Sequence, residues 1–73
     1  MSAISDRIRE RVDDLGLRAI DLAAACRVSE NTADRWLAGA NDPKANALLP
    51  LAALLDVNVE WILGADIDPA PHT

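Results

Sequence analysis

The chain has few of the residues that build disulfides, metal sites and catalytic centres. It contains one cysteine, one histidine, two tryptophans, and neither tyrosine nor phenylalanine. A single cysteine excludes an internal disulfide, and no histidine pair or second thiol gives the ligand spacing of a zinc site. No nucleophile and base pair or carboxylate dyad is recognisable either. We therefore expect a protein that is not an enzyme, with no metal, no cofactor and no small-molecule substrate.

Long apolar runs are also absent. No apolar stretch approaches the roughly 18 residues that a membrane helix needs, and no charged leader precedes an apolar segment. A cytoplasmic protein without membrane contact is the expectation. Hydrophobic residues make up 51% of the 73 residues, which is enough for one compact core. Because aromatics are scarce and alanine is common, that core suits closely packed helices, and we expect an all-α domain.

The most informative stretch is LRAIDLAAACRVSENTADRWLAG, residues 17–39. It has the pattern of two short helices joined by a tight turn, with a small residue, Ala23, where the helices cross. Ser29 is placed to accept a hydrogen bond from an unpaired amide of the next helix, which should begin near Glu30. The other inward-facing positions of the pair are Leu22, Cys26, Val28, Ala33 and Trp36.

This pattern resembles the DNA-binding domains of the lambda-repressor and Cro type. The resemblance continues through LLPLAALLDVNVEWILG, residues 48–64, whose ending is similar to phage repressors in particular. It implies a compact five-helix domain over residues 1–64: a first helix, the helix-turn-helix pair, a loop and two further helices. The core positions in the later stretch are Leu48, Leu51, Leu55, Val57, Val59, Trp61 and Leu63. Residues 65–73, acidic and rich in proline, are expected to form a flexible tail or the start of a linker.

Three residues depart from that family's pattern. Arg18 stands where a serine or threonine often caps the first helix of the pair, so the cap is missing or comes from backbone and water. Arg27 stands in the turn where glycine is common, and a left-handed arginine there costs about 1 kcal/mol. Pro50 cannot donate a backbone hydrogen bond, so the fourth helix either begins near Asn46, leaving Pro50 close to its first turn, or bends.

The first helix is predicted over residues 5–14, with Gly16 placed to end it. Its apolar face comprises Ile4, Ile8, Val12 and Leu15. Its other faces alternate acids with three arginines, Arg7, Arg9 and Arg11. These mixed charges suit a solvated surface with weak local pairs, and the alternative is that the arginines contact DNA phosphates.

Charge is unevenly distributed along the chain. The formal net charge is −5, which repels a phosphate backbone. Residues 17–46 nevertheless carry four acids and four bases, whereas residues 47–73 carry four acids and no lysine or arginine. The segment expected to face DNA is therefore neutral, and most of the excess acidity lies beyond it.

The resemblance assigns base recognition to the start of the second helix of the pair, which enters the major groove in such domains. Asn31 suits bidentate pairing with adenine, and Arg35 suits guanine or a phosphate. Glu30 either accepts from a cytosine amino group or serves the helix dipole. Asp34 would be repelled by phosphates, unless it orients Arg35 or rejects wrong sequences.

Backbone contacts and dimerisation complete the expected binding mode. The residues expected at the DNA backbone are Arg18, Ala19, Thr32, Asn41, Lys44 and Asn46. A small module with few cations needs a two-fold dimer, and the last helix is the candidate interface, through Val59, Ile62 and Leu63. Ile62 in particular is expected to stay exposed on the monomer. The alternative is that Trp61 and Leu63 simply seal the core, and for Trp61 this alternative is favoured.

The leading hypothesis is thus a sequence-specific DNA-binding regulator of transcription, a repressor of phage or prophage type that reads a palindromic operator as a homodimer. The alternative is an acidic protein-interaction module that kept the fold and does not bind DNA, which the low isoelectric point of about 4.5 allows. Salt separates the two, because a DNA reader loses affinity steeply as ionic strength rises.

Overall fold

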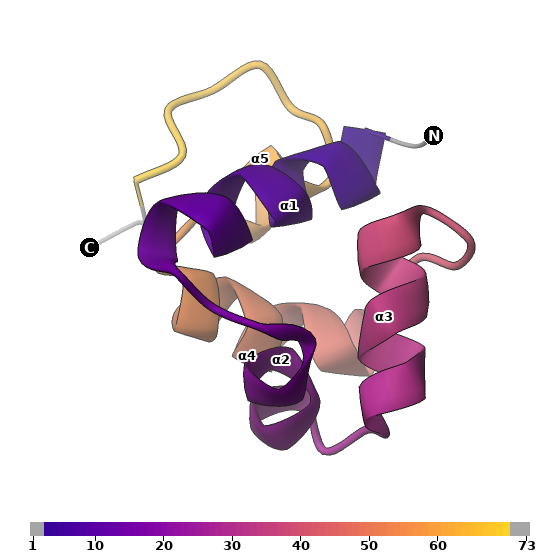
Figure 1. Cartoon of the computed structure of the whole chain (residues 1–73). Coiled ribbons are helices and arrows are strands. Elements are labelled where there is room, and N and C mark those ends of the chain that lie inside the picture. The colour runs from indigo at the N-terminus through magenta and orange to yellow at the C-terminus, as the bar shows by residue number, and fades with distance from the viewer. Residues whose placement is uncertain (1–2, 71–73) are drawn as a thin grey trace.

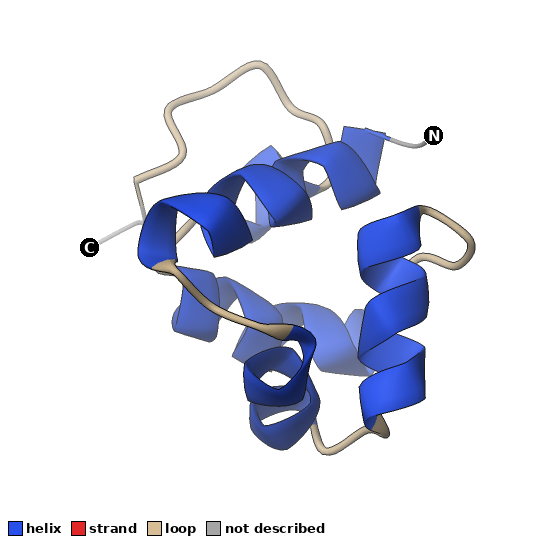
Figure 2. Cartoon of the chain, viewed as in Figure 1, coloured by secondary structure: helices blue, strands red, loops and turns tan. Residues whose placement is uncertain are grey.

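Five helices account for most of the computed structural model, which describes residues 3–70. They are α1 (Ala3–Leu15), α2 (Ala19–Cys26), α3 (Glu30–Ala38), α4 (Ala45–Leu55) and α5 (Val59–Ile62). The described residues contain no strand, and none of their helices is long and apolar enough to cross a bilayer (Figure 2). The expected all-α, five-helix architecture is confirmed. Of the predicted tail, residues 71–73 lie outside the described part.

The helices surround a core that contains few large side chains. Ala23 and Ala33 are buried, one on each of the two packed helices α2 and α3, as the sequence predicted for these inward-facing positions. Trp36 and Trp61 are also buried, and Cys26 and Val28 pack half-buried against the core. The remaining buried apolar residues are Ile8, Val12, Leu22, Ala47, Leu51, Ala52, Leu55, Val57 and Ile62. In Figure 1, α1 lies above α2 and α4, with α3 at their side.

Two leucines predicted to be buried are exposed instead. Leu15 is 44% exposed, because the chain reverses at Gly16 (φ 68°) and Leu17 packs against the core in its place. Leu63 is 50% exposed, because α5 ends at Ile62 and Leu63 lies beyond its single turn. Ile4, by contrast, packs half-buried against the core as expected.

All five helices end in the same way. The chain turns at a left-handed residue, and the next residue donates its N–H at 3.0 Å to the carbonyl five positions earlier, which is the long bond of the Schellman motif. The left-handed residues are Gly16, Arg27, Gly39, Asp56 and Gly64. The prediction that Gly16 ends the first helix is confirmed, and Arg27 adopts the left-handed conformation whose cost the sequence analysis considered. At Arg27 and Asp56 the conformation costs about 1 kcal/mol each.

Pro50 lies inside α4 rather than in its first turn. The helix begins at Ala45, so Pro50 is its sixth residue. Since proline has no N–H, the Asn46 carbonyl loses its usual partner within the helix. Asn46 is exposed, so water can take that place. The helix start was thus predicted to within one residue, and Pro50 lies one residue deeper in the helix than a start at Asn46 would place it.

Cys26 joins α2 to α4. Its thiol donates to the Ala47 carbonyl, with 3.7 Å between sulfur and oxygen, and burial raises the pKa of the thiol. The side chain therefore stays protonated at neutral pH and serves packing, which agrees with the sequence prediction.

Candidate nucleic-acid interface

Helix α3 turns one face to the core and the other to solvent. Ala33 and Trp36 are buried, whereas the four side chains expected to read bases are exposed. They form two rows, because residues four apart share a helix face: Asn31 with Arg35, and Glu30 with Asp34. A neutral-to-basic row thus lies beside an acidic one on the surface of α3.

The start of α3 is fixed by its cap. Ser29 Oγ accepts a hydrogen bond from the Thr32 N–H at 3.1 Å, and the two hydroxyl oxygens lie 2.9 Å apart. The predicted cap and the predicted start at Glu30 are both confirmed. The bond between the hydroxyls also holds the Thr32 side chain in place, next to the cleft described below.

A cleft of about 550 Å³ lies beside α3, between it, the loop that follows, and the start of α4. Four of the six residues expected at the DNA backbone line it: Thr32, Asn41, Lys44 and Asn46. Its floor includes the buried Trp36 and Ala47. Residues as far apart in the sequence as Thr32 and Ala47, which are fifteen positions apart, therefore line the same cleft.

Sequence reasoning missed one charged member of this cleft. Asp42 lines it together with Lys44, so the cleft has one carboxylate and one ammonium group rather than a net positive charge. The turn-rich sequence around Asp42 and Pro43 indicated a loop but gave no direction for the aspartate side chain. Attraction of an anion to this cleft consequently depends on Lys44 and on neutral donors.

The other two expected backbone contacts, Arg18 and Ala19, lie apart from the cleft at the start of α2. Arg18 is exposed, and Ala19 is half-buried. An arginine side chain has no acceptor and cannot cap a helix; instead, Asp21 Oδ2 accepts the Arg18 N–H at 2.8 Å. The cap thus comes from Asp21, a residue that the sequence prediction passed over. Its carboxylate already occupies one of the amides at this helix end.

The three arginines of α1 do not belong to this surface. Arg7 Nη1 donates to the carbonyls of Trp61 at 2.5 Å and Ala65 at 2.7 Å. Arg9 donates to the Leu37 carbonyl at 3.1 Å, and Arg11 donates through two nitrogens to the Leu55 carbonyl, at 3.2 and 3.0 Å.

Each α1 arginine therefore joins α1 to the C-terminal end of another helix. The weak local pairs predicted from sequence do exist, between Arg9 and Asp6 and between Arg11 and Asp14. Neither prediction, solvated surface or phosphate contact, foresaw the bonds between helices, because sequence spacing reveals only partners on the same helix.

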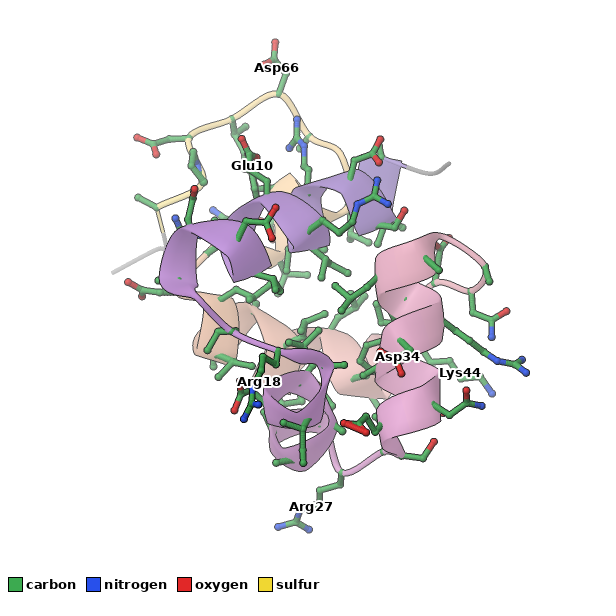
Figure 3. All side chains as sticks on the ribbon, viewed as in Figure 1. Glu10, Arg18, Arg27, Asp34, Lys44 and Asp66 are labelled. Atoms are coloured by element: carbon green, nitrogen blue, oxygen red, sulfur yellow. The ribbon has the colours of Figure 1, made fainter. Side chains whose placement is uncertain are left out.

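The remaining cations lie elsewhere. Within residues 3–70, the four basic residues of the helix-turn-helix region and its loop make no ion pair: Arg18, Arg27, Arg35 and Lys44. Figure 3 places Arg27 at the turn between α2 and α3, at the opposite end of the molecule from Glu10 and Asp66. Asp66, from the acidic C-terminal segment, thus lies far from the turn that carries Arg27.

One of the three residues proposed for the dimer interface is buried. Ile62 has no exposed surface, so the expectation that it stays exposed on the monomer is wrong. Helix α5 packs against both α1 and α4, which covers the adjacent side chains Trp61 and Ile62 from two directions. Leu63 is half exposed and Val59 is half-buried, so only these two remain available to a second copy.

Comparison with known proteins gives consistent results. A family model described as helix-turn-helix matches residues 8–62. The HTH-type transcriptional regulator DicA of Escherichia coli (strain K12) is 32% identical over 68 residues, which are 93% of this chain and 50% of that protein. The chain thus spans about half the length of this relative.

A solved structure is similar as well. The P22 c2 repressor, crystallised in complex with synthetic operator 9T in the presence of Tl⁺, superposes with a TM-score of 0.80 at 26% sequence identity. The match covers 90% of this chain and 100% of that one.

Proposed function

The chain belongs to the helix-turn-helix family of the lambda-repressor and Cro type, and from this premise we propose that it is a cytoplasmic transcriptional regulator that binds double-stranded DNA. Its similarity to a regulator of transcription and to a repressor crystallised with operator DNA supports this proposal. We propose that it represses transcription in the manner of phage regulators. DNA binding would need no cofactor, because all of the groups proposed to bind DNA are side chains and amides of the protein.

In the proposed complex, α3 enters the major groove with its N-terminal end. Asn31 and Arg35, which share one exposed row, read base edges: the amide suits adenine, and the guanidinium suits guanine. The neighbouring row, Glu30 and Asp34, selects by a different means. Glu30 accepts from cytosine, and Asp34 disfavours sites where an acceptor or phosphate lies opposite it.

One observation carries the proposal: residues that would bind the DNA backbone line a single cleft beside α3. Thr32, Asn41, Lys44 and Asn46 offer a hydroxyl, two amides and an ammonium group there. These are groups that donate to phosphate oxygens in protein–DNA complexes. Arg18 and the amide of Ala19, at the start of α2, would contact the backbone separately.

We propose further that two copies bind together to a palindromic site. A domain with a net charge of −5 gains little from phosphate attraction alone, and a two-fold dimer doubles its contacts. The proposed dimer interface would use two residues, Leu63 and Val59. Leu63 is half exposed just after α5, and Val59 is half-buried at the start of α5.

Selection of bound duplexes from a random-sequence pool at low salt, followed by sequencing, tests both levels. Enrichment of a site with two-fold symmetry is the expected result, and the half-site spacing would report the dimer geometry. Recovery of no duplex above background would reject DNA binding and favour a protein-interaction module. The exposed acidic row on α3 supports that second candidate.

A further inference from the structure

Arg27 stands at the junction of α2 and α3 in a conformation that favours glycine. Its backbone is left-handed, with φ 57° and ψ 45°, and the turn is closed by the Val28 N–H, which donates to the Ala23 carbonyl at 3.0 Å. The side chain is exposed and forms no ion pair within the described residues. A glycine at this position would close the same turn without the steric conflict between Cβ and the carbonyl.

The position of Arg27 relative to α3 indicates what the side chain does. Arg27 is two residues before Ser29, which caps the N-terminus of α3. Figure 3 draws the Arg27 side chain projecting from the turn away from the body of the protein, whereas Lys44 lies on the other side of α3. A cation thus stands at each flank of the helix that would enter the groove.

The acidic side chains of α3 repel phosphates, and the positive charge of Arg27 would offset this repulsion. Glu30, in the first turn of α3, and Asp34 are both exposed, and both repel nearby phosphates. The other flank offers Lys44 beside Asp42, so it supplies no net positive charge. Arg27 has no acid among its described contacts, and its full charge is available to a phosphate.

We propose that Arg27 is an additional DNA-binding residue of this chain, one that contacts a backbone phosphate next to the groove occupied by the start of α3. The inference rests on the proposed DNA binding and adds a contact that the helix-turn-helix pattern does not include, since that pattern has glycine at the turn. Arginine suits the role because its planar fork donates two hydrogen bonds to one phosphate.

The competing explanation is purely structural: a cation at the end of α2 interacts favourably with the negative end of the helix dipole. That role would affect folding stability and leave the salt dependence of DNA binding unchanged. Three variants separate the two roles. Arg27→Lys keeps the charge. Arg27→Gln removes the charge but keeps a side chain, and thus the strain, on the left-handed backbone. Arg27→Gly removes both the charge and the strain.

A matched control exists at Asp56. This residue is left-handed at the end of α4, with φ 56° and ψ 49°, and closes the same type of turn. It lies near the C-terminal end of α1, where Arg11 binds the adjacent Leu55 carbonyl. Asp56→Gly therefore reproduces the backbone change of Arg27→Gly away from α3.

The experiment measures affinity for a mixed-sequence DNA duplex and for the selected operator at several salt concentrations, with thermal unfolding of each variant. We expect Arg27→Gln and Arg27→Gly to lower the salt slope by about one relative to the unsubstituted chain. Between 50 and 200 mM salt, their affinity deficit should shrink about threefold to fourfold, which follows from a slope of about 0.9 per phosphate. Arg27→Lys and Asp56→Gly should keep the original slope.

Each result has a distinct meaning. An unchanged slope in Arg27→Gln and Arg27→Gly, with normal binding by the unsubstituted chain, overturns the phosphate contact and leaves the proposed function intact. A change of slope in Asp56→Gly as large as that in Arg27→Gly would also overturn it, because the effect would then come from the backbone. Absence of duplex binding by the unsubstituted chain rejects the proposed function and, with it, this inference.

Discussion

The same residue type serves two different purposes in two regions of this molecule. On α1, the three arginines at positions 7, 9 and 11 donate to carbonyls at the ends of α5, α3 and α4. In residues 17–46, the arginines and the lysine are exposed and form no ion pair within the described chain. The first group holds helices together, and the second is available to a ligand.

The difference follows from what lies near each group. The last carbonyls of a helix have no partner within it, and three helices end beside α1. An arginine fork, with five donors and no acceptor, satisfies such carbonyls well. At the end of α3, by contrast, the Trp36 and Arg35 carbonyls already accept from the Gly39 and Ala40 amides, and the Ser29 hydroxyl at its start accepts from the Thr32 amide. Of the seven basic residues, the four on this side are therefore the ones that we propose for DNA binding.

The largest effect expected to test this division is the loss of Arg7. Arg7→Met keeps the apolar stem and removes two hydrogen bonds to carbonyls, together with the stacking of the guanidinium 4.9 Å from the centre of the Trp61 ring. We expect the free energy of unfolding to fall by about 2–3 kcal/mol. Thermal unfolding measures this as a drop of about 10–20 °C in Tm for a domain of this size.

DNA binding provides the contrast for that variant. At a temperature where Arg7→Met is folded, its salt slope should equal that of the unsubstituted chain, because Arg7 contacts only the protein. A slope lowered by about one would move Arg7 into the DNA-binding group and break the comparison.

A second prediction concerns the reading of bases. Asn31 is exposed in the first turn of α3, so Asn31→Ala should leave stability nearly unchanged. Discrimination at one base pair of the selected site should fall by about 1–3 kcal/mol, while preference at the other positions persists. Affinities for the selected duplex and its single-base-pair substitutions give the result. Undiminished preference at every position would assign base reading to another residue.

Arg9 sharpens the comparison because it joins the two regions. It lies on α1, yet its acceptor is the Leu37 carbonyl near the end of α3. If the division holds, Arg9→Met should behave like Arg7→Met on a smaller scale, with a loss of about 1 kcal/mol of stability in urea unfolding. Its salt slope should not change. A lowered slope at full stability would be the opposite pattern and would count Arg9 as a phosphate contact.

Much of this fold was readable from the sequence because its signals are local. The Ser29 cap, Gly16 at the end of α1, and Ala23 at the α2–α3 crossing each depend on a few neighbouring residues. Exposure at helix ends was not readable in the same way. Leu15 and Leu63 fit an apolar pattern, but the chain reverses beside each of them, and Ile62 is covered because α5 meets two helices at once.

The candidate site divides along the same line. Exposure of Asn31 and Arg35 follows from helix periodicity once Ala33 and Trp36 face inward, so these positions were predictable. The cleft was not, because it depends on how the loop after α3 folds against the start of α4 and places Asp42 and Lys44 at the same cleft. The bonds of the α1 arginines join residues up to 58 positions apart, which no spacing rule reveals.

Replacement of Lys44 should have the opposite effect to replacement of Arg7 or Arg9, because it should lower DNA affinity and change the stability of the protein least. Lys44 precedes α4, and its side chain makes no capping bond there, so Lys44→Ala should change stability by less than about 0.5 kcal/mol. Affinity should fall alike for the selected operator and for mixed-sequence duplex, with a salt slope lower by about one. Arg9→Met and Lys44→Ala should therefore show opposite patterns. Arg9→Met should lower the stability and keep the salt slope, whereas Lys44→Ala should lower the salt slope and keep the stability. If Lys44→Ala instead altered preference at a single base pair, the cleft would face the bases rather than the backbone, and the docking of α3 would have to be rotated about its axis.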